Sequence, residues 1–161
     1  MCGKTTDFLL KIMSSFKGTY QYSVDAKGRI NLPLKLRKNV SPDASDTFIV
    51  TRGVKNCLYV YPKDEWEKKE VELRKLNSYN EDDDKFLHAL LENAEDVLLD
   101  SQSRIMIPQQ LREFANIQSD VHVIGLLEKI ELWNPQAYVE YKKSFTESYG
   151  QIAAKVMGPK G

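Results

Sequence analysis

The chain has 161 residues, of which 42% are hydrophobic and 29% are charged, a balance typical of a globular protein. Its 23 basic residues equal its 23 acidic residues, so total charge neither favours nor excludes a polyanionic partner, and a site for one must come from local clustering. Cys2 and Cys57 are too few for the disulfide framework of a small secreted protein. His88 and His122 have no partners at zinc-site spacing, so we expect no metal site.

The first apolar stretch, "FLL" at residues 8–10, is too short for a signal-peptide core or a membrane span. We interpret residues 1–15 as a loosely attached leader or extension. The expectation is a cytoplasmic protein without membrane attachment.

Residues 17–64 predict a small unit of two hairpins. Tyr20, Tyr22 and Val24 alternate with polar residues, the period of a half-buried strand, and "DAKG" at residues 25–28 predicts a type I turn. The next strand ends at Pro33, which cannot donate to a sheet and suits the first turn of a short helix. "TFIVTRG" and "CLYVYP" then predict a β-hairpin.

Two helices are expected in the connection at residues 65–93. One begins after Pro62, with Trp66 and Leu73 on one stripe, and the other follows the acidic run at residues 81–84. That run lacks calcium-loop spacing and suits a helix start, where negative charge is favourable. Trp66 and, later, Trp133 are interpreted as packing anchors, because neither has basic neighbours arranged to hold a single strand.

Residues 94–137 repeat residues 17–64. At a constant offset of 75, Asp25 aligns with Asp100 and Arg29 with Arg104, and six of the thirteen positions from Asp25 to Arg37 are identical. Composition alone would give about one identity, so the chain contains an internal duplication. A single helix is expected after Pro135, within a C-terminal segment at residues 138–161. It carries apolar and aromatic residues at intervals of three and four: Tyr138, Tyr141, Phe145, Tyr149 and Ile152.

One such unit buries too little surface to be stable alone. Two copies that pair their edge strands can form one core, so we predict an α+β fold: a pseudo-symmetric β-barrel from two tandem repeats, with helices appended.

The spacing of Asp25 and Arg29 has two interpretations. An ion pair across the turn can hold the guanidinium at a defined angle, or it can only staple the hairpin, which contributes roughly 0–1 kcal/mol when exposed. Residues 21–38 carry five basic residues and one acidic residue, Asp25, for a net charge of +4. The equivalent residues 96–113 have a net charge of −1, so a phosphate-binding surface is expected in the first repeat.

The segment "VDAKGRINLP" followed by "LKLR" resembles the swapped-hairpin, AbrB-type DNA-binding module. Two tandem copies, "FKGTYQYSVDAKGR" and "AEDVLLDSQSRIMIPQQLREFANI", are similar to the MraZ family of bacterial regulators from Phe16 to about Tyr149. One departure is Ser103, which stands where the first copy has Gly28; if that position needs a positive φ, serine costs roughly 1 kcal/mol.

The resemblance implies a double-split, swapped-hairpin barrel and a transcriptional regulator in the cytoplasm and on the nucleoid. It implies binding to double-stranded DNA at repeated boxes upstream of its own operon in the division and cell-wall gene cluster, by a ring-like homo-oligomer. The implied DNA-binding residues are Asp25, Lys27, Gly28, Arg29, Asp100 and Arg104, with possible phosphate contacts from Lys35, Arg37 and Lys38.

Two alternatives stay open. One is an oligomeric protein-interaction scaffold without DNA binding, and the other is an AbrB-type antitoxin. An enzyme is not expected, because the chain has no nucleophile elbow, no glycine-rich phosphate loop and no His-Glu-x-x-His. No cofactor and no small-molecule substrate are expected either.

Overall fold

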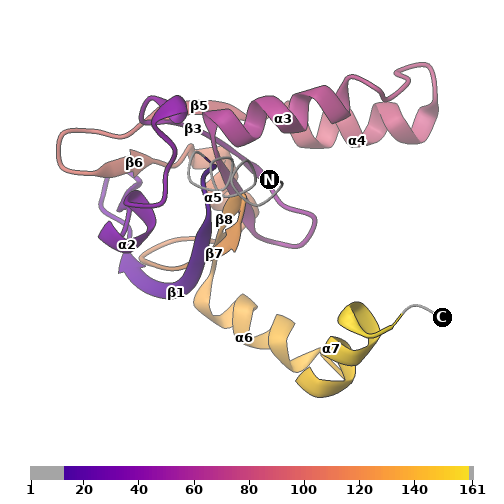
Figure 1. Cartoon of the computed structure of the whole chain (residues 1–161). Helices are drawn as coiled ribbons and strands as arrows, with labels where there is room; N and C mark the ends of the chain where they lie inside the picture. The colour runs from indigo at the N-terminus through magenta and orange to yellow at the C-terminus, as the bar shows by residue number, and fades with distance from the viewer. Residues whose placement is uncertain (1–12, 160–161) are drawn as a thin grey trace, which may run out of the picture.

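The computed structural model describes residues 13–159, so the predicted leader lies mostly outside the described residues. The described strands are β1 (Phe16–Ser23), β2 (Arg29–Asn31), β3 (Thr47–Arg52), β4 (Leu58–Pro62), β5 (Glu95–Leu98), β6 (Arg104–Met106), β7 (Asp120–Leu127) and β8 (Lys129–Trp133). The described helices are α2 (Leu34–Arg37), a 3-10 turn η1 (Pro42–Ala44), α3 (Lys63–Leu73), α4 (Glu81–Leu91), α5 (Gln109–Phe114), α6 (Pro135–Lys143) and α7 (Tyr149–Met157). The α+β class predicted from the sequence is confirmed (Figure 1).

The two halves of the chain exchange strands. Six strands form one antiparallel sheet in the order β1-β7-β8-β4-β3-β5, and β2 and β6 form a separate two-stranded sheet. The leading strand of the first half, β1, therefore pairs with β7 of the second half, and β5 of the second half pairs with β3 of the first. Within residues 13–159 no pairing of β1 with β5 closes the larger sheet into a barrel.

Equivalent residues of both halves build one hydrophobic core. Ile30 and Ile105 pair directly across β2 and β6, and each is 1% exposed. Leu36 of α2 and Leu111 of α5 lie in the same cluster. Burial of each such side chain stabilises the fold by about 1.5–3 kcal/mol, and neither half could bury its share alone.

Two helical extensions pack on the sheet away from this core. Helices α3 and α4 contribute Trp66, Leu73 and Leu90, which pack on Ile49 and Tyr61 of the sheet. Helix α6 packs on β7 and β8 through aromatic contacts, and Tyr141 stacks on Trp133 at 5.0 Å between ring centroids. Both tryptophans are thus packing anchors, as predicted.

The single helix predicted after Pro135 is wrong. It ends at Lys143, and α7 begins only at Tyr149. The new start is set by a capping box, in which the Ser148 side chain accepts from the Gln151 N–H and the Gln151 side chain accepts from the Ser148 N–H. The three-and-four spacing of aromatic residues continues across the break, which is why periodicity alone missed it.

The acidic run at residues 81–84 forms the first turn of α4, as predicted, directly after the N-cap Asn80. His88 is exposed on the same helix, 3.4 Å from Asp84. No helix in residues 13–159 has both the length and the apolar composition needed to cross a membrane.

Candidate nucleic-acid interface

The first turn is built around the carboxylate of Asp25. Its Oδ1 accepts hydrogen bonds from the backbone N–H of Lys27 at 2.9 Å and of Arg29 at 2.8 Å. Its Oδ2 accepts from Arg29 Nε at 2.7 Å, and the Gly28 N–H donates to the Asp25 carbonyl at 3.0 Å. The carboxylate therefore fixes the turn and the direction of the guanidinium together.

The second turn repeats this arrangement. Asp100 Oδ1 accepts from the backbone N–H of Gln102 and Arg104, and Oδ2 accepts from Arg104 Nε at 2.9 Å. In addition, Arg104 Nη1 lies 3.8 Å from Asp25 Oδ2, so one carboxylate of the first turn also faces the arginine of the second. The predicted pairs are thus formed in both repeats and brought next to each other.

These hydrogen bonds lower the pKa of both carboxyl groups. The backbone N–H of Arg29 is the largest cause for the lowered pKa of Asp25, and the backbone N–H of Arg104 is the largest cause for that of Asp100. Both aspartates remain ionised near neutral pH, so the anchoring of the two arginines is not titrated there.

The two-stranded sheet between the turns exposes one face. Arg29 lies opposite Met106, Ile30 opposite Ile105, and Asn31 opposite Arg104. Because side chains alternate along a strand and the two isoleucines point into the core, the other four point outward. Arg29 and Arg104 side chains are 27% and 22% exposed, so they are accessible and not sealed inside the molecule.

We call the outward residues Arg29, Asn31, Arg104 and Met106, with their turns, the β2/β6 ribbon. The sequence analysis did not single out Asn31 or Met106. The period-2 alternation around Ile30 and Ile105 could have found them, since it places both on the same face as the arginines.

The fourth residue of each turn has a positive φ, 82° at Gly28 and 61° at Ser103. At Gly28 the chain also needs space, because a Cβ there would lie 2.6 Å from Arg112 Cζ. Arg112 is held in place by its Nε, which donates to the Ile107 carbonyl at 3.0 Å. A residue of the second half thus packs on the first turn, a contact that the sequence did not predict.

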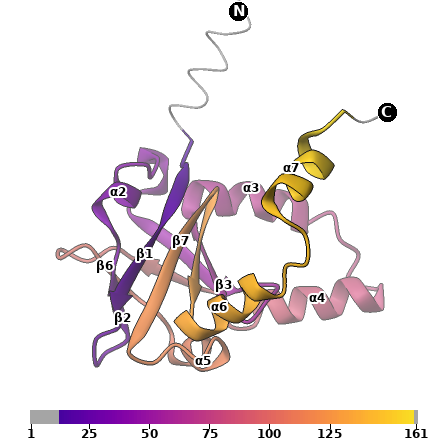
Figure 2. The same ribbon diagram turned by 90° about the horizontal axis from the view of Figure 1, so that it is seen from below.

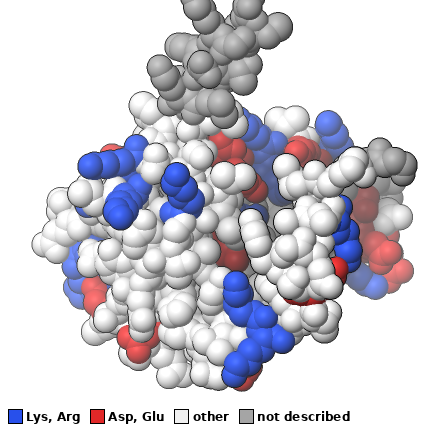
Figure 3. All heavy atoms as spheres, turned by 60° about the horizontal axis from the view of Figure 1, so that its bottom comes forward, with Lys and Arg blue, Asp and Glu red and all other residues white. Residues whose placement is uncertain are grey.

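The remaining predicted basic residues differ in their surroundings. Lys27, Lys35 and Lys38 are exposed. Arg37 is half-buried, and its Nε donates to the Leu32 carbonyl at 2.9 Å, which ties α2 to the strand before it. Both turns project from the side of the molecule opposite to α4 and α7 (Figure 2). On the face drawn in Figure 3, Lys and Arg side chains lie in separate groups on a mostly uncharged surface.

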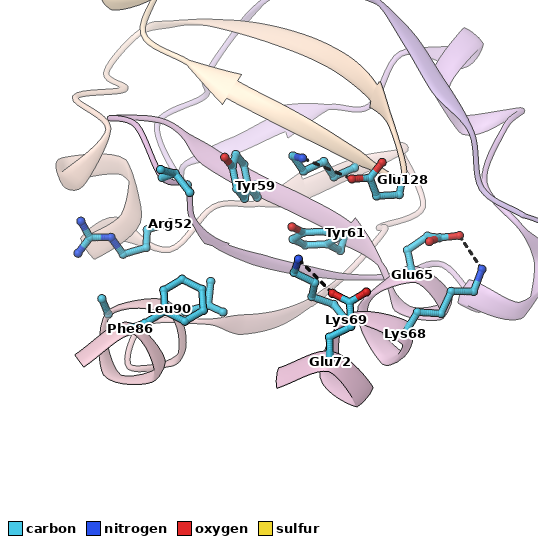
Figure 4. A pocket seen from close by; sticks show the side chains of 14 residues that line it. Arg52, Tyr59, Tyr61, Glu65, Lys68, Lys69, Glu72, Phe86, Leu90 and Glu128 are labelled. Atoms are coloured by element: carbon cyan, nitrogen blue, oxygen red, sulfur yellow. Dashed lines mark hydrogen bonds and ion pairs between the residues drawn. The ribbon is translucent and has the colours of Figure 1, made fainter. Parts of the chain in front are cut away.

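A cleft lies apart from the β2/β6 ribbon. A cleft of about 710 Å³ is bounded by the ends of β3 and β4 and by α3 and α4 (Figure 4). Tyr59, Tyr61, Phe86 and Leu90 supply its apolar walls, and its charged rim pairs Lys68 with Glu65 at 3.0 Å. It contains no Asp–Arg turn and is separate from the β2/β6 ribbon.

Metal binding and thiol chemistry have little support in the described residues. Among residues 13–159 there is no group of three or more His, Cys, Asp or Glu placed to hold a metal ion. Cys57 is buried, and burial raises the pKa of its thiol to about 12, so this thiol is a poor nucleophile.

The comparisons with known proteins agree with the duplication. The family model described as "MraZ protein, putative antitoxin-like" matches twice, at residues 15–89 and 90–157. A protein of Halothermothrix orenii named Transcriptional regulator MraZ is 40% identical over 139 residues, which cover 86% of this chain and 94% of that protein. Proteins of the same name from Acetivibrio thermocellus and Clostridium tetani are each 38% identical over 141 residues, covering 88% of this chain and 96% of the relative. Two matches of one family model and relatives of this similarity lead to one conclusion: the chain belongs to the MraZ family.

Proposed function

We propose that the protein is a transcription regulator that binds double-stranded DNA in a sequence-specific manner through the β2/β6 ribbon. The observation that carries the proposal is the pairing of two carboxylate-anchored arginines, Arg29 and Arg104, on one exposed face. The name Transcriptional regulator, which the similar proteins bear, supports the same role.

A two-stranded ribbon with outward arginines suits DNA recognition. A two-stranded β-ribbon fits the major groove, and arginine is the usual partner of guanine O6 and N7. Each arginine uses its Nε for its own aspartate, and within the described residues the terminal nitrogens of Arg29 make no hydrogen bond. Those nitrogens are available to a base edge, while Lys27, Lys35 and Lys38 suit phosphate contacts, which position the protein.

We also propose that the exchange of β1 and β5 makes this a swapped-hairpin, AbrB-like barrel, with β2 and β6 as its DNA-facing part. In such a barrel the two turns belong to one rigid unit, because each is anchored in the core of the other half. The shared cluster that contains Ile30 and Ile105 supports this arrangement.

Strong binding to DNA requires several copies of the chain. One turn neutralises about two phosphates, which gives a salt slope of only about −1.8. Copies that engage repeated boxes together multiply the affinity through effective concentration. Self-association into a ring-like homo-oligomer is supported by α7, which buries no residue and leaves Tyr149 88% and Met157 84% exposed, and by the open aromatic cleft of Figure 4.

The target that the family resemblance supports is the protein's own operon in the division and cell-wall gene cluster. Closely spaced repeats of one short box upstream of that operon are the expected sites. The protein is expected in the cytoplasm and on the nucleoid. Examination of the upstream DNA for such repeats is the first check.

The decisive test is binding of the purified protein to its upstream duplex by fluorescence anisotropy over a series of salt concentrations. We expect Arg29→Ala to lower the affinity by about 10-fold to 100-fold, the range for loss of one bidentate base contact. Arg74→Ala is the matched control, because Arg74 is an exposed arginine at the end of α3. Retained affinity in Arg29→Ala would contradict the role of the ribbon.

A scaffold without DNA binding is the second candidate, and the exposed apolar side chains of α7 are the observation that favours it. It predicts self-association in sedimentation experiments together with salt-insensitive, undetectable binding to any duplex. An antitoxin role, which the family description mentions, predicts instead a toxin gene next to this one and a tight complex with its product.

A further inference from the structure

The two ends of the β2/β6 ribbon differ at one pair of equivalent positions. Arg29 and Arg104 are equivalent at the offset of 75, and so are Asn31 and Met106, but only the arginines are identical. In the antiparallel register, Arg29 lies opposite Met106 and Arg104 lies opposite Asn31. Each end of the ribbon therefore carries the same arginine beside a different neighbour.

Both differing residues are accessible. Asn31 is exposed and Met106 is 49% exposed, and both share the outward face with the arginines. Residues directly opposite in an antiparallel pair have Cβ atoms about 4.5–5.5 Å apart. An arginine and its neighbour at this separation can contact the same base pair or adjacent base pairs in one groove.

The chemical difference extends beyond these two residues. Met106 lies in a shallow depression with Leu98, which is 70% exposed, and Pro108. The residue equivalent to Leu98 in the first half is Ser23, which is exposed and polar. Glu95 and Asp96 border the Met106 depression, so this end suits an apolar base contact and not a phosphate.

The two ends of the ribbon suit different base edges. Asparagine pairs with adenine N6 and N7 through two hydrogen bonds, whereas an apolar side chain contacts the thymine methyl group. A ribbon with two identical ends would select a palindromic sequence, since the same residues would meet each half of the site. Unequal neighbours remove that symmetry while the arginine-read positions keep it.

We propose that Asn31 and Met106 are specificity-determining residues that make the DNA site of each copy asymmetric. The end with Arg104 and Asn31 selects a guanine beside an adenine, and the end with Arg29 and Met106 selects a guanine beside a thymine. The proposal rests on DNA binding through the ribbon and adds to it the direction in which each copy lies on its box.

The test is selection of preferred sequences from a randomised duplex library by the full chain and four variants. These are Asn31→Met, Met106→Asn, the double exchange, and Asn56→Met, which changes an exposed asparagine in the β3–β4 connection as the matched control. Thermal unfolding of each variant checks that the fold is kept, and a fifth variant, Asn31→Ser, provides a second, smaller change at position 31.

We expect the parent chain and Asn56→Met to select the same asymmetric site. Asn31→Met should make the selected site symmetric, with thymine at both neighbour positions, and should lower discrimination for adenine by about 10-fold to 100-fold. The double exchange should select the same duplex as the parent chain, because a site with its two ends reversed is the parent duplex read from its other strand.

Two negative outcomes are distinguishable. A parent chain that selects a site, together with Asn31→Met, Asn31→Ser and Met106→Asn variants that select the same site, would overturn this inference and leave DNA binding by the ribbon standing. A parent chain that selects no sequence would overturn the proposed function, and this inference with it.

Discussion

The two turns of this protein have the same hydrogen bonds and different residues. Asp25 and Asp100 each hold an arginine through Nε and accept from two backbone N–H groups. The first turn has Gly28 at its left-handed position, and the second has Ser103. The hydrogen bonds of the aspartate are therefore sufficient to hold a non-glycine residue at a positive φ, at a cost of about 1 kcal/mol.

This difference shows that glycine has a second role in the first turn. A Cβ on residue 28 would lie 2.6 Å from Arg112 Cζ, so a larger residue in the first turn would have to displace this side chain as well as adopt the left-handed conformation. The second turn has a Cβ at the equivalent position and tolerates it. The following predictions test how far the two turns are equivalent.

The largest effect is expected in the core below the turns. Ile30→Ala and Ile105→Ala should each lower the free energy of unfolding by about 2–5 kcal/mol, because each leaves a cavity where two equally buried side chains meet. Urea unfolding monitored by circular dichroism measures both. A loss in one variant less than half of that in the other would break the equivalence of the two halves.

Gly28→Ala should destabilise the protein by about 1–2 kcal/mol, the cost of an L-residue in the left-handed region, and should also displace Arg112. Ser103→Ala, the matched change in the second turn, should alter stability by less than about 0.5 kcal/mol, because that residue already has a Cβ at positive φ. A double-mutant cycle with Arg112→Ala separates the steric part from the conformational part. Equal losses in Gly28→Ala and Ser103→Ala would show that neither the positive φ of residue 28 nor the Arg112 contact has energetic importance.

Ser103→Gly should have a smaller effect of the opposite sign. Glycine removes the strain of the positive φ, so we expect a gain of up to about 1 kcal/mol, reduced by the greater freedom of glycine in the unfolded chain. The melting temperature from calorimetry measures it. A loss of stability would mean that the side chain of Ser103 contributes more than its backbone costs.

The smallest effect is expected from pH. The pKa of Asp25 and of Asp100 is lowered from 3.8 by hydrogen bonds, so their stabilising effect is complete above that value and is lost only as the pH falls below it, through the folded-state pKa. Stability and DNA affinity should therefore not change between pH 8 and pH 5 through these groups. Carboxyl chemical shifts followed by NMR would report both titrations, and a midpoint above 3.8 for either aspartate would contradict the geometry of its turn.

Local features of the fold were predictable from the sequence. The turn at residues 25–28, the hairpin of β3 and β4 and the start of α3 after Pro62 follow from turn residues, alternation and proline, which act over a few residues. The duplication indicated that the halves share a core, and Ile30 opposite Ile105 bears this out. Assignment of DNA contacts to particular residues stays a prediction.

Features that depend on distant residues were not predictable in the same way. Nothing in residues 16–23 specifies that β1 pairs with β7, because the pairing is decided by the other half of the chain. The contact of Arg112 with Gly28 joins residues far apart in sequence. The break between α6 and α7 was missed because Ser148 and Gln151 form a local cap within an uninterrupted aromatic spacing.

The exchange of β1 and β5 makes the two halves of the chain resemble the subunits of a strand-exchanged dimer, joined here by a covalent connection. In a dimer of identical subunits, every substitution occurs at both symmetric positions, so the two ends of the ribbon must stay alike. In a single chain the two halves can differ, as they do at Gly28 and Ser103 and at Asn31 and Met106. A ribbon carried by one continuous chain can therefore have two chemically different ends, and so a direction.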